Sequence, residues 1–188
     1  MNSKPILIVP GEPNSIFLEI FFKSIKYKYS SPLIIIVSKK LLIKQMKHLN
    51  FNYEINLINK DYKNFNRLNN KMINLIDVNY NFKNIFEKIS NKSNDYIENC
   101  FKIALDILKK NKTFKFINGP ISKKNFLHKK YLGITEYLAK KTTKDGNVTM
   151  LIFNKKLSVS PITTHLPLKK VHKNISKKKI FQKVYLIN

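Results

Sequence analysis

Two continuous apolar runs most constrain what this chain can fold into. The runs are PILIVP at residues 5–10 and LIIIVS at residues 33–38, and in neither do apolar and polar side chains alternate. Successive side chains of a strand point to opposite faces of a sheet, so a strand that is apolar throughout is buried on both faces. Such strands are typical of parallel sheets covered by helices on both sides.

Helical spacing follows each of these two runs. Residues 14–28 and 39–50 are the candidate helices, and further strands are expected at 53–59 and 114–119. The expected buried stripe of the first helix consists of Ile16, Phe17, Ile20, Phe21 and Ile25. Alternation of strands and helices predicts an α/β fold with right-handed crossovers.

The clearest helical pattern covers residues 93–111. Ser93 or Asn94 can cap it, acidic side chains occupy its first turn and lysines its last. Its expected buried stripe consists of Ile97, Phe101, Ala104 and Leu108. The Asn- and Lys-rich stretch before it, residues 60–92, is expected to be irregular, with one strand at the apolar island MINLIDV.

The remaining chain has weaker patterns. Two short helices separated near Gly133 are expected, then a hairpin of strands at 148–153 and 157–164 joined by NKK. A last helix is expected to start at Ser176 and to run on without a stop signal. We therefore expect the 188 residues to be a portion of a longer protein.

Charge and composition separate two classes of function. The net charge is +25, from 36 Lys and Arg against 11 Asp and Glu, which would suit a polyanionic partner. Arg67 is the only arginine, however, and nucleic-acid surfaces favour arginine for its bidentate contacts. The lysines are spread along the whole chain together with Asn and Ile, which favours AT-rich codon usage as their origin. A basic nucleic-acid-binding protein is kept as the alternative from another class.

The single cysteine indicates a compartment. Cys100 has no partner within the chain for a disulfide and lies in a helical pattern, where it is expected to be a small core residue. No apolar stretch approaches the roughly 18 residues of a spanning helix, and the amino terminus has too short an apolar run for a secretory signal. A cytoplasmic protein that does not cross a membrane is expected.

Two loops and one histidine are candidates for chemistry. Gly119 follows a predicted parallel strand, at the edge where open α/β sheets place ligands, and nearby Lys123 could meet a phosphate or carboxylate or be merely solvated. Gly11 could likewise open a turn or an anion site, and the hydroxyl group of Thr135 could cap a helix or touch a ligand.

His165 lies where a strand breaks into a loop, although a lone histidine is more often structural than a ligand and catalytic zinc uses about three protein ligands. The remaining histidines, which look exposed, are His48, His128 and His172.

Four blocks in one order carry a resemblance. PGEP at 10–13, INGPISK at 117–123, GITE at 133–136 and TTHLPLKKV at 163–171 resemble the 4-hydroxythreonine-4-phosphate dehydrogenase family of pyridoxal phosphate biosynthesis. The resemblance extends from residue 5 to about residue 180, and GPISK and TTHLPL are its most specific pieces.

The resemblance implies an architecture and a reaction. It implies an α/β/α sandwich resembling the isocitrate and isopropylmalate dehydrogenase-like fold, truncated at the C-terminus. Residues 1–188 would be the N-terminal portion of a two-domain subunit, whose domain boundary the sequence does not locate, and the full-length protein would be a homodimer. The implied reaction is metal-assisted oxidation of a phosphorylated amino hydroxy acid, 4-phosphooxy-L-threonine, by NAD or NADP. Decarboxylation to 3-amino-2-oxopropyl phosphate then follows, in pyridoxine 5'-phosphate biosynthesis.

The resemblance also assigns roles to residues. His165 matches a ligand of the divalent metal, which would be Zn, Mg or Co, and Thr135 matches a contact to substrate. Lys123 and Glu136 are candidate catalytic groups, and Ile134 stands where the family has a histidine that donates a hydrogen bond to substrate. The residues that hold NAD or NADP are not located by the sequence.

Three departures from the family pattern matter. Ile134 cannot donate a hydrogen bond, and the later glycines of the first block are replaced. The family's other metal and substrate ligands would lie beyond Asn188, so the chain alone is expected to be inactive. These departures keep two alternatives open, a dehydrogenase of a related phosphorylated hydroxy acid and an inactive family member.

Overall fold

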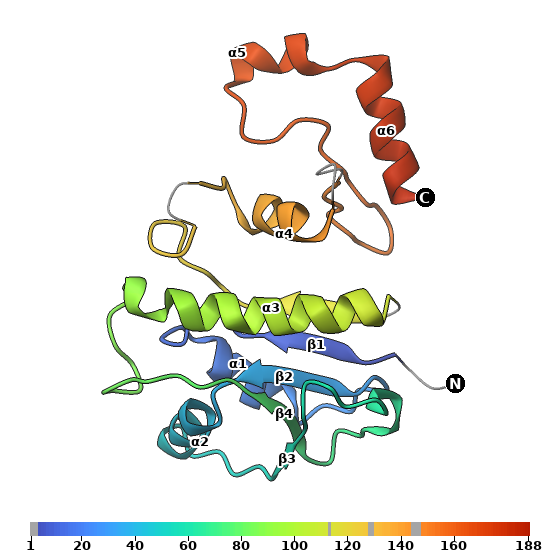
Figure 1. Ribbon diagram of the computed structural model, residues 1–188. Coiled ribbons are helices and arrows are strands. Elements are labelled where there is room, and N and C mark those ends of the chain that lie inside the picture. The colour runs from blue at the N-terminus through green and yellow to red at the C-terminus, as the bar shows by residue number, and fades with distance from the viewer. Residues whose placement is uncertain (1–3, 113, 128–129, 144–147) are drawn as a thin grey trace. The chain divides into compact units, whose positions relative to one another are not determined.

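The computed structural model describes residues 4–112, 114–127, 130–143 and 148–188 (Figure 1). The chain divides into two compact units, Met1–Phe126 and Leu127–Asn188, and each is described by itself. Over the described ranges, no helix is long and apolar enough to span a membrane.

The first unit is built on a five-stranded sheet with the order β3-β4-β2-β1-β5, and every neighbouring pair is parallel. The strands are β1 (Ile6–Val9), β2 (Leu33–Val37), β3 (Ile55–Leu57), β4 (Ile73–Asp77) and β5 (Lys115–Asn118). The strands expected at 5–10, 33–38, 53–59 and 114–119 are present as β1, β2, β3 and β5, and the apolar island in 60–92 forms β4. The prediction of an α/β fold with a parallel sheet is confirmed.

Helices cover both faces of this sheet (Figure 1). The helices α1 (Phe17–Ser24) and α2 (Lys39–His48) lie on one face and α3 (Asn94–Lys110) on the other. The strand order explains this, because the chain moves one way along the sheet from β1 to β2 to β3 and the opposite way from β4 to β5. Right-handed crossovers that run in opposite directions place their helices on opposite faces.

The buried face of α1 differs from the expected one. Ile16 and Ile20 are 61% and 52% exposed, whereas the buried side chains of this helix are Leu18, Phe21 and Phe22. The expected stripe was therefore wrong at Ile16 and Ile20 and right at Phe21, while Phe17 and Ile25 are half-buried. Glu19 and Lys23 form an i,i+4 ion pair on the outward side of the helix, and at 100° per residue Ile16 and Ile20 lie on that same side. The helix therefore turns its two neighbouring phenylalanines inward.

The buried face of α3 agrees better with expectation. Ile97, Phe101 and Ala104 are fully buried and Cys100 is 2% exposed, as a core cysteine should be. Leu108 is only half-buried, because in the last turn Ile107 packs inward instead. Ser93 lies at the N-cap position without a side-chain cap bond, so the expected cap is not formed.

The connections between β3 and α3 are mostly irregular, as expected for residues 60–92. They contain two short 3-10 turns, η1 (Phe65–Arg67) and η2 (Asn91–Ser93), besides β4.

The second unit contains α4 (Ile134–Thr142), α5 (Leu168–Val171), η3 (His172–Asn174) and α6 (Lys177–Ile187). The last helix begins where expected, and the Ser176 hydroxyl accepts a hydrogen bond from the Lys179 N–H at 3.3 Å. The helix expected before Gly133 is present only as turns up to residue 127, and its remainder includes 128–129, outside the described residues.

The expected hairpin is reduced to one antiparallel bridge between Ile152 and Val159. Their N–H groups donate to each other's carbonyl oxygens at 2.8 and 2.9 Å. Pro161 has no N–H to extend the ladder along the second arm. The prediction of two regular strands at 148–153 and 157–164 was therefore wrong.

Candidate functional site

The carboxyl edge of the sheet between β1 and β5 brings two of the sequence motifs together. Because β1 and β5 are parallel neighbours, the loops that follow them leave the sheet side by side at its carboxyl edge, where open α/β sheets bind ligands. The loop after β1 carries PGEP and the loop after β5 carries GPIS. The two blocks are separated in sequence by most of the first unit, yet they form one structural feature.

These two loops touch along their main chains. The Gly119 N–H donates to the Val9 carbonyl at 2.8 Å, and the Glu12 N–H donates to the Pro120 carbonyl at 2.9 Å. Gly11 has φ +77°, and a Cβ there would overlap the Pro120 carbonyl oxygen. A Cβ on Gly119 would overlap the Pro10 carbonyl oxygen and would also lie 2.6 Å from Cδ2 of Phe17. Both glycines therefore serve a close approach of two backbones.

Glu12 reinforces this contact with its side chain. Its Oε1 accepts a hydrogen bond from the Ser122 N–H at 3.2 Å, and its Oε2 accepts one from the Ser93 hydroxyl at 3.2 Å. The residue is only 3% exposed. Burial raises the pKa of Glu12, and the hydrogen bonds from Ser122 and Ser93 partly offset that rise. One carboxyl group thus joins the β1 loop, the β5 loop and the start of α3.

The loop after β1 makes its own turn. The Ser15 N–H donates to the Glu12 carbonyl at 3.1 Å and the Phe17 N–H donates to the Ser15 hydroxyl at 3.3 Å. Because the Glu12 N–H is also engaged, at least three N–H groups of this loop have partners inside the protein. Of the two interpretations of Gly11, the geometry favours the turn over an anion site.

Lys123 lies directly after this contact, in the first unit. Its side chain is exposed, and it starts a turn closed by hydrogen bonds from the Asn125 N–H to the Ser122 hydroxyl at 3.1 Å and from the Phe126 N–H to the Ser122 carbonyl at 2.9 Å.

The other four predicted site residues belong to the second unit. Ile134, Thr135 and Glu136 form the first turn of α4, and all three are half-buried. Gly133 occupies the N-cap position, so the suggestion that Thr135 caps the helix was wrong.

Glu136 and His165 are brought together in this unit. The Glu136 Oε1 and the His165 Nε2 are 3.8 Å apart, with side chains 34% and 40% exposed. His165 has φ +57°, in the left-handed region. The second carboxylate oxygen, Oε2 of Glu136, is buried and has no hydrogen-bond partner within the described ranges. The pair therefore offers one imidazole and one carboxylate with a free acceptor atom.

This pair does not make a complete metal site. No cluster of three or more His, Cys, Asp or Glu side chains able to hold a metal occurs among the residues that the structure describes. Catalytic zinc typically uses about three protein ligands. Two donors fall short of that number, so Glu136 and His165 do not suffice to hold a catalytic metal by themselves. His48 and His172 are exposed, as expected, and His128 lies outside the described residues.

Two contributors to the site were missed by sequence reasoning. Glu12 could have been noticed as an acidic residue directly after a buried strand, but the neighbouring glycine gave the stronger signal. The sequence offers Ser93 as one of two candidate helix caps, whereas in the structure its hydroxyl donates to Glu12. No local pattern distinguishes these two uses of a serine.

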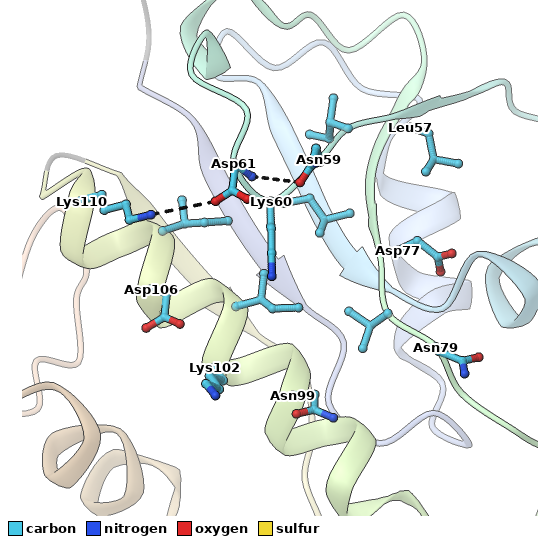
Figure 2. A pocket seen from close by; sticks show the side chains of 15 residues that line it. Leu57, Asn59, Lys60, Asp61, Asp77, Asn79, Asn99, Lys102, Asp106 and Lys110 are labelled. Carbon is cyan, nitrogen blue, oxygen red and sulfur yellow. Dashed lines mark hydrogen bonds and ion pairs between the residues drawn. The ribbon is translucent and has the colours of Figure 1, made fainter.

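A groove of about 910 Å³ lies between α3 and the connection that follows β3 (Figure 2). Figure 2 shows Lys60 and Asp61 of that connection opposite Lys102 and Asp106 of α3, and an ion pair of 4.0 Å joins Asp61 to Lys110. None of the five predicted site residues lines it.

Comparison with known proteins identifies relatives. The family model of the pyridoxal phosphate biosynthetic protein PdxA matches residues 28–188. The 4-hydroxythreonine-4-phosphate dehydrogenase of Sulfurihydrogenibium sp. (strain YO3AOP1) is 35% identical over 190 residues, covering 97% of this chain and 56% of the relative. That of Aquifex aeolicus (strain VF5) is 30% identical over 195 residues, covering 100% of this chain and 57% of the relative.

Solved structures share the fold. The 4-hydroxythreonine-4-phosphate dehydrogenase from Klebsiella pneumoniae superposes with a TM-score of 0.76 at 23% identity, over 97% of this chain and 57% of that chain. The enzyme from Burkholderia phymatum gives 0.79 at 20% identity, over 97% and 56%.

The chain spans a little more than half the length of these relatives, 56% in the Sulfurihydrogenibium protein. The family match nevertheless extends over most of the chain, residues 28–188, and includes the GPISK, GITE and TTHLPL blocks. The resemblance seen in the sequence is confirmed, and the chain belongs to the family of the pyridoxal phosphate biosynthetic protein PdxA.

Proposed function

We propose that this chain is the N-terminal portion of a 4-hydroxythreonine-4-phosphate dehydrogenase. The complete protein would oxidise the secondary alcohol of 4-phosphooxy-L-threonine, also called 4-hydroxythreonine-4-phosphate, with NAD or NADP. Decarboxylation would then yield 3-amino-2-oxopropyl phosphate. The names of the relatives at 35% and 30% identity support the reaction. The proposal includes the isocitrate dehydrogenase-like sandwich as the architecture of the complete subunit.

One structural observation carries the proposal. The loops that hold PGEP and GPIS meet at the carboxyl edge of the neighbouring parallel strands β1 and β5, the edge where open α/β sheets place ligands. These two motifs lie far apart in the sequence and both carry the family resemblance, so their contact at one edge of the sheet supports a ligand site there.

The proposed roles follow from residue chemistry. Exposed Lys123 would meet the phosphate or carboxylate of substrate as a point charge. The Thr135 hydroxyl would donate to or accept from substrate, and the Ile134 side chain would contact it without a hydrogen bond. Glu136 would face the His165 ring and fix its orientation, as carboxylates beside metal-binding histidines do.

His165 is proposed as one ligand of a divalent metal, Zn, Mg or Co, whose other ligands come from outside the described residues. When bound, such a metal supplies Lewis-acid assistance and the nicotinamide accepts the hydride. A homodimer in the cytoplasm completes the proposal, and the single, buried Cys100 supports a reducing compartment.

The test uses the complete protein with 4-hydroxythreonine-4-phosphate, NAD or NADP and a divalent metal, and follows the absorbance of reduced nicotinamide. Turnover is expected with one of the two cofactors. Thr135→Ala and His165→Ala should each lower kcat/KM by about a hundredfold or more, and His165→Ala should also weaken zinc binding in calorimetry. His172→Ala, at an exposed histidine of the same unit, is the control and should leave both unchanged. Absence of turnover with both cofactors would contradict the proposed reaction.

A second substrate is favoured by one specific observation. Ile134, at the start of α4, gives no hydrogen-bond donor where the family resemblance implies a histidine. A related phosphorylated hydroxy acid that needs no such donor should then be turned over faster than 4-hydroxythreonine-4-phosphate in the same assay.

A further inference from the structure

We infer that Glu12 is a positioning residue whose buried carboxyl group clamps the loop after β5 to the loop after β1, and thereby fixes the turn that carries Lys123. The clamp rests on contacts within the first unit. Only the purpose assigned to it, the placement of Lys123, rests on the proposed function.

The clamp has a main-chain part and a side-chain part. The Glu12 N–H holds the Pro120 carbonyl at 2.9 Å, and its Oε1 holds the Ser122 N–H at 3.2 Å. One residue thus binds the β5 loop at two points on either side of Ile121. Since Ser122 also closes the turn through Asn125 and Phe126, the position of Ser122 sets where Lys123 begins.

The second carboxylate oxygen anchors the clamp to α3. The Ser93 Oγ lies 3.2 Å from Oε2 of Glu12 and 3.2 Å from the Ser90 carbonyl oxygen. A hydroxyl group has one proton to donate, so it can serve only one of these acceptors at a time. The Ser93 hydroxyl donates to the Glu12 carboxylate, and the Ser90 carbonyl oxygen is the alternative acceptor of the same proton.

Burial excludes a direct catalytic role. Glu12 is 3% exposed, so its carboxyl group is out of reach of a ligand at the surface of the loops. Within the described ranges, no Lys, Arg or His nitrogen lies within 4.0 Å of it to form an ion pair. Burying a carboxyl group without a cationic partner costs free energy. Removing the Glu12 side chain would nevertheless leave the Ser122 N–H without its acceptor. These contacts assign Glu12 to holding the loop in place.

The experiment measures amide hydrogen exchange by NMR in the complete chain. In Glu12→Ala, exchange at Ser122, Asn125 and Phe126 should rise by about tenfold or more relative to wild type. Exchange at Ile35, in the centre of β2, should stay unchanged and would show that the rise is local. Glu12→Gln keeps an acceptor for Ser122 and can donate to Ser93, so it should restore protection to within about threefold of wild type.

Two further variants complete the design. Glu12→Asp keeps the carboxylate but is one methylene shorter, so the amides of Ser122, Asn125 and Phe126 should lose protection as in Glu12→Ala. If Glu12→Ala does not fold, Glu12→Asp is the variant that tests the inference. Glu54→Ala and Glu54→Gln repeat the changes at an exposed glutamate and should alter nothing at Ser122. Unchanged exchange at Ser122, Asn125 and Phe126 in Glu12→Asp and in any folded Glu12→Ala would overturn the inference.

Titration with inorganic phosphate separates this inference from the proposed function. In wild type the Lys123 amide signal should shift with phosphate, and Glu12→Asp should weaken that binding about fivefold while Glu12→Gln restores it. If phosphate leaves the wild-type Lys123 signal unmoved, the proposed role of Lys123 fails, while a local rise of exchange at Ser122 would still support the clamp.

Discussion

The position that a side chain on Gly11 would need is occupied by the carbonyl oxygen of Pro120. Gly11 also has φ +77°, a conformation that other residues adopt only with strain. The next residue, Glu12, donates its N–H to the same carbonyl oxygen at 2.9 Å. Backbone shape and hydrogen bonding therefore select the same close contact between the β1 loop and the β5 loop.

Gly11→Ala is expected to lower the free energy of unfolding by about 2 kcal/mol or more, because the left-handed backbone and the overlap with Pro120 both oppose a Cβ. Urea unfolding followed by circular dichroism measures the change. Gly133→Ala is the control: its Cβ would lie 3.1 Å from a flexible carboxylate oxygen of Glu136, and its φ of −165° suits any residue. A smaller loss, under about 1 kcal/mol, is expected there. Equal losses would contradict this account of Gly11.

Glu12 should make the stability of the protein depend on pH. Burial raises the pKa of Glu12 above its ordinary value of 4.5, so the folded state binds this proton more tightly than the unfolded state. The stabilising contribution is complete below 4.5 and is lost as the pH rises through the raised pKa. We expect the free energy of unfolding of wild type, relative to Glu12→Gln, to fall across that window. A difference that does not vary between about pH 4 and about pH 8 would contradict this.

Glu87 provides a control of opposite sign for that experiment. Hydrogen bonds from the Asn84 and Lys83 N–H groups to its Oε1, both 2.8 Å, lower the pKa of Glu87 below 4.5. Its contribution is present above 4.5 and is lost as the pH falls through the lowered pKa. The free energy of unfolding of wild type relative to Glu87→Gln should therefore rise with pH.

The sheet was largely readable from the sequence because of its physical signature. A parallel strand buried on both faces leaves no polar positions, and the apolar residues of β1 and β2 show this directly. Helix α1 shows the limit of apolar spacing alone, because Ile16 and Ile20 fit an apolar stripe and yet are exposed. The polar pair Glu19 and Lys23 marks their side of the helix as the outward one. Backbone pairing at 148–164 also depends on partners that no local pattern specifies.

The candidate site was only partly readable for a different reason. The order of the PGEP, GPIS and GITE blocks indicated which loops matter, but their contacts depend on residues distant in sequence. Glu12 and Ser122 are 110 positions apart. A glutamate in a loop is normally solvated, and only the fold reveals that this one is buried. The pairing of Glu136 with His165 likewise depends on the fold, because the two residues are distant in sequence and neither local pattern specifies the other.

Cys100 should be unreactive in the folded protein. Its thiol is 2% exposed and burial raises its pKa to about 12, so almost no thiolate is present near neutral pH. An aromatic disulfide reagent should label it only after unfolding in urea. Lys102→Cys places a second thiol on the exposed side of α3 and should react within minutes in the native protein. Native labelling of wild type at the rate seen in urea would show that the core around Cys100 opens readily.

Ile134→His tests whether the first turn of α4 faces the substrate. The family resemblance implies a histidine that donates a hydrogen bond to substrate, and isoleucine offers no donor. Restoring one donor to a phosphorylated ligand should tighten binding of 4-hydroxythreonine-4-phosphate to the complete protein by about tenfold, measured by calorimetry. Leu132→His is the control, because it adds a histidine at a side chain that is 59% exposed just before the helix, and it should not change affinity. Tighter binding together with turnover would show that Ile134 limits substrate recognition, whereas unchanged affinity in both variants would remove Ile134 from the substrate site.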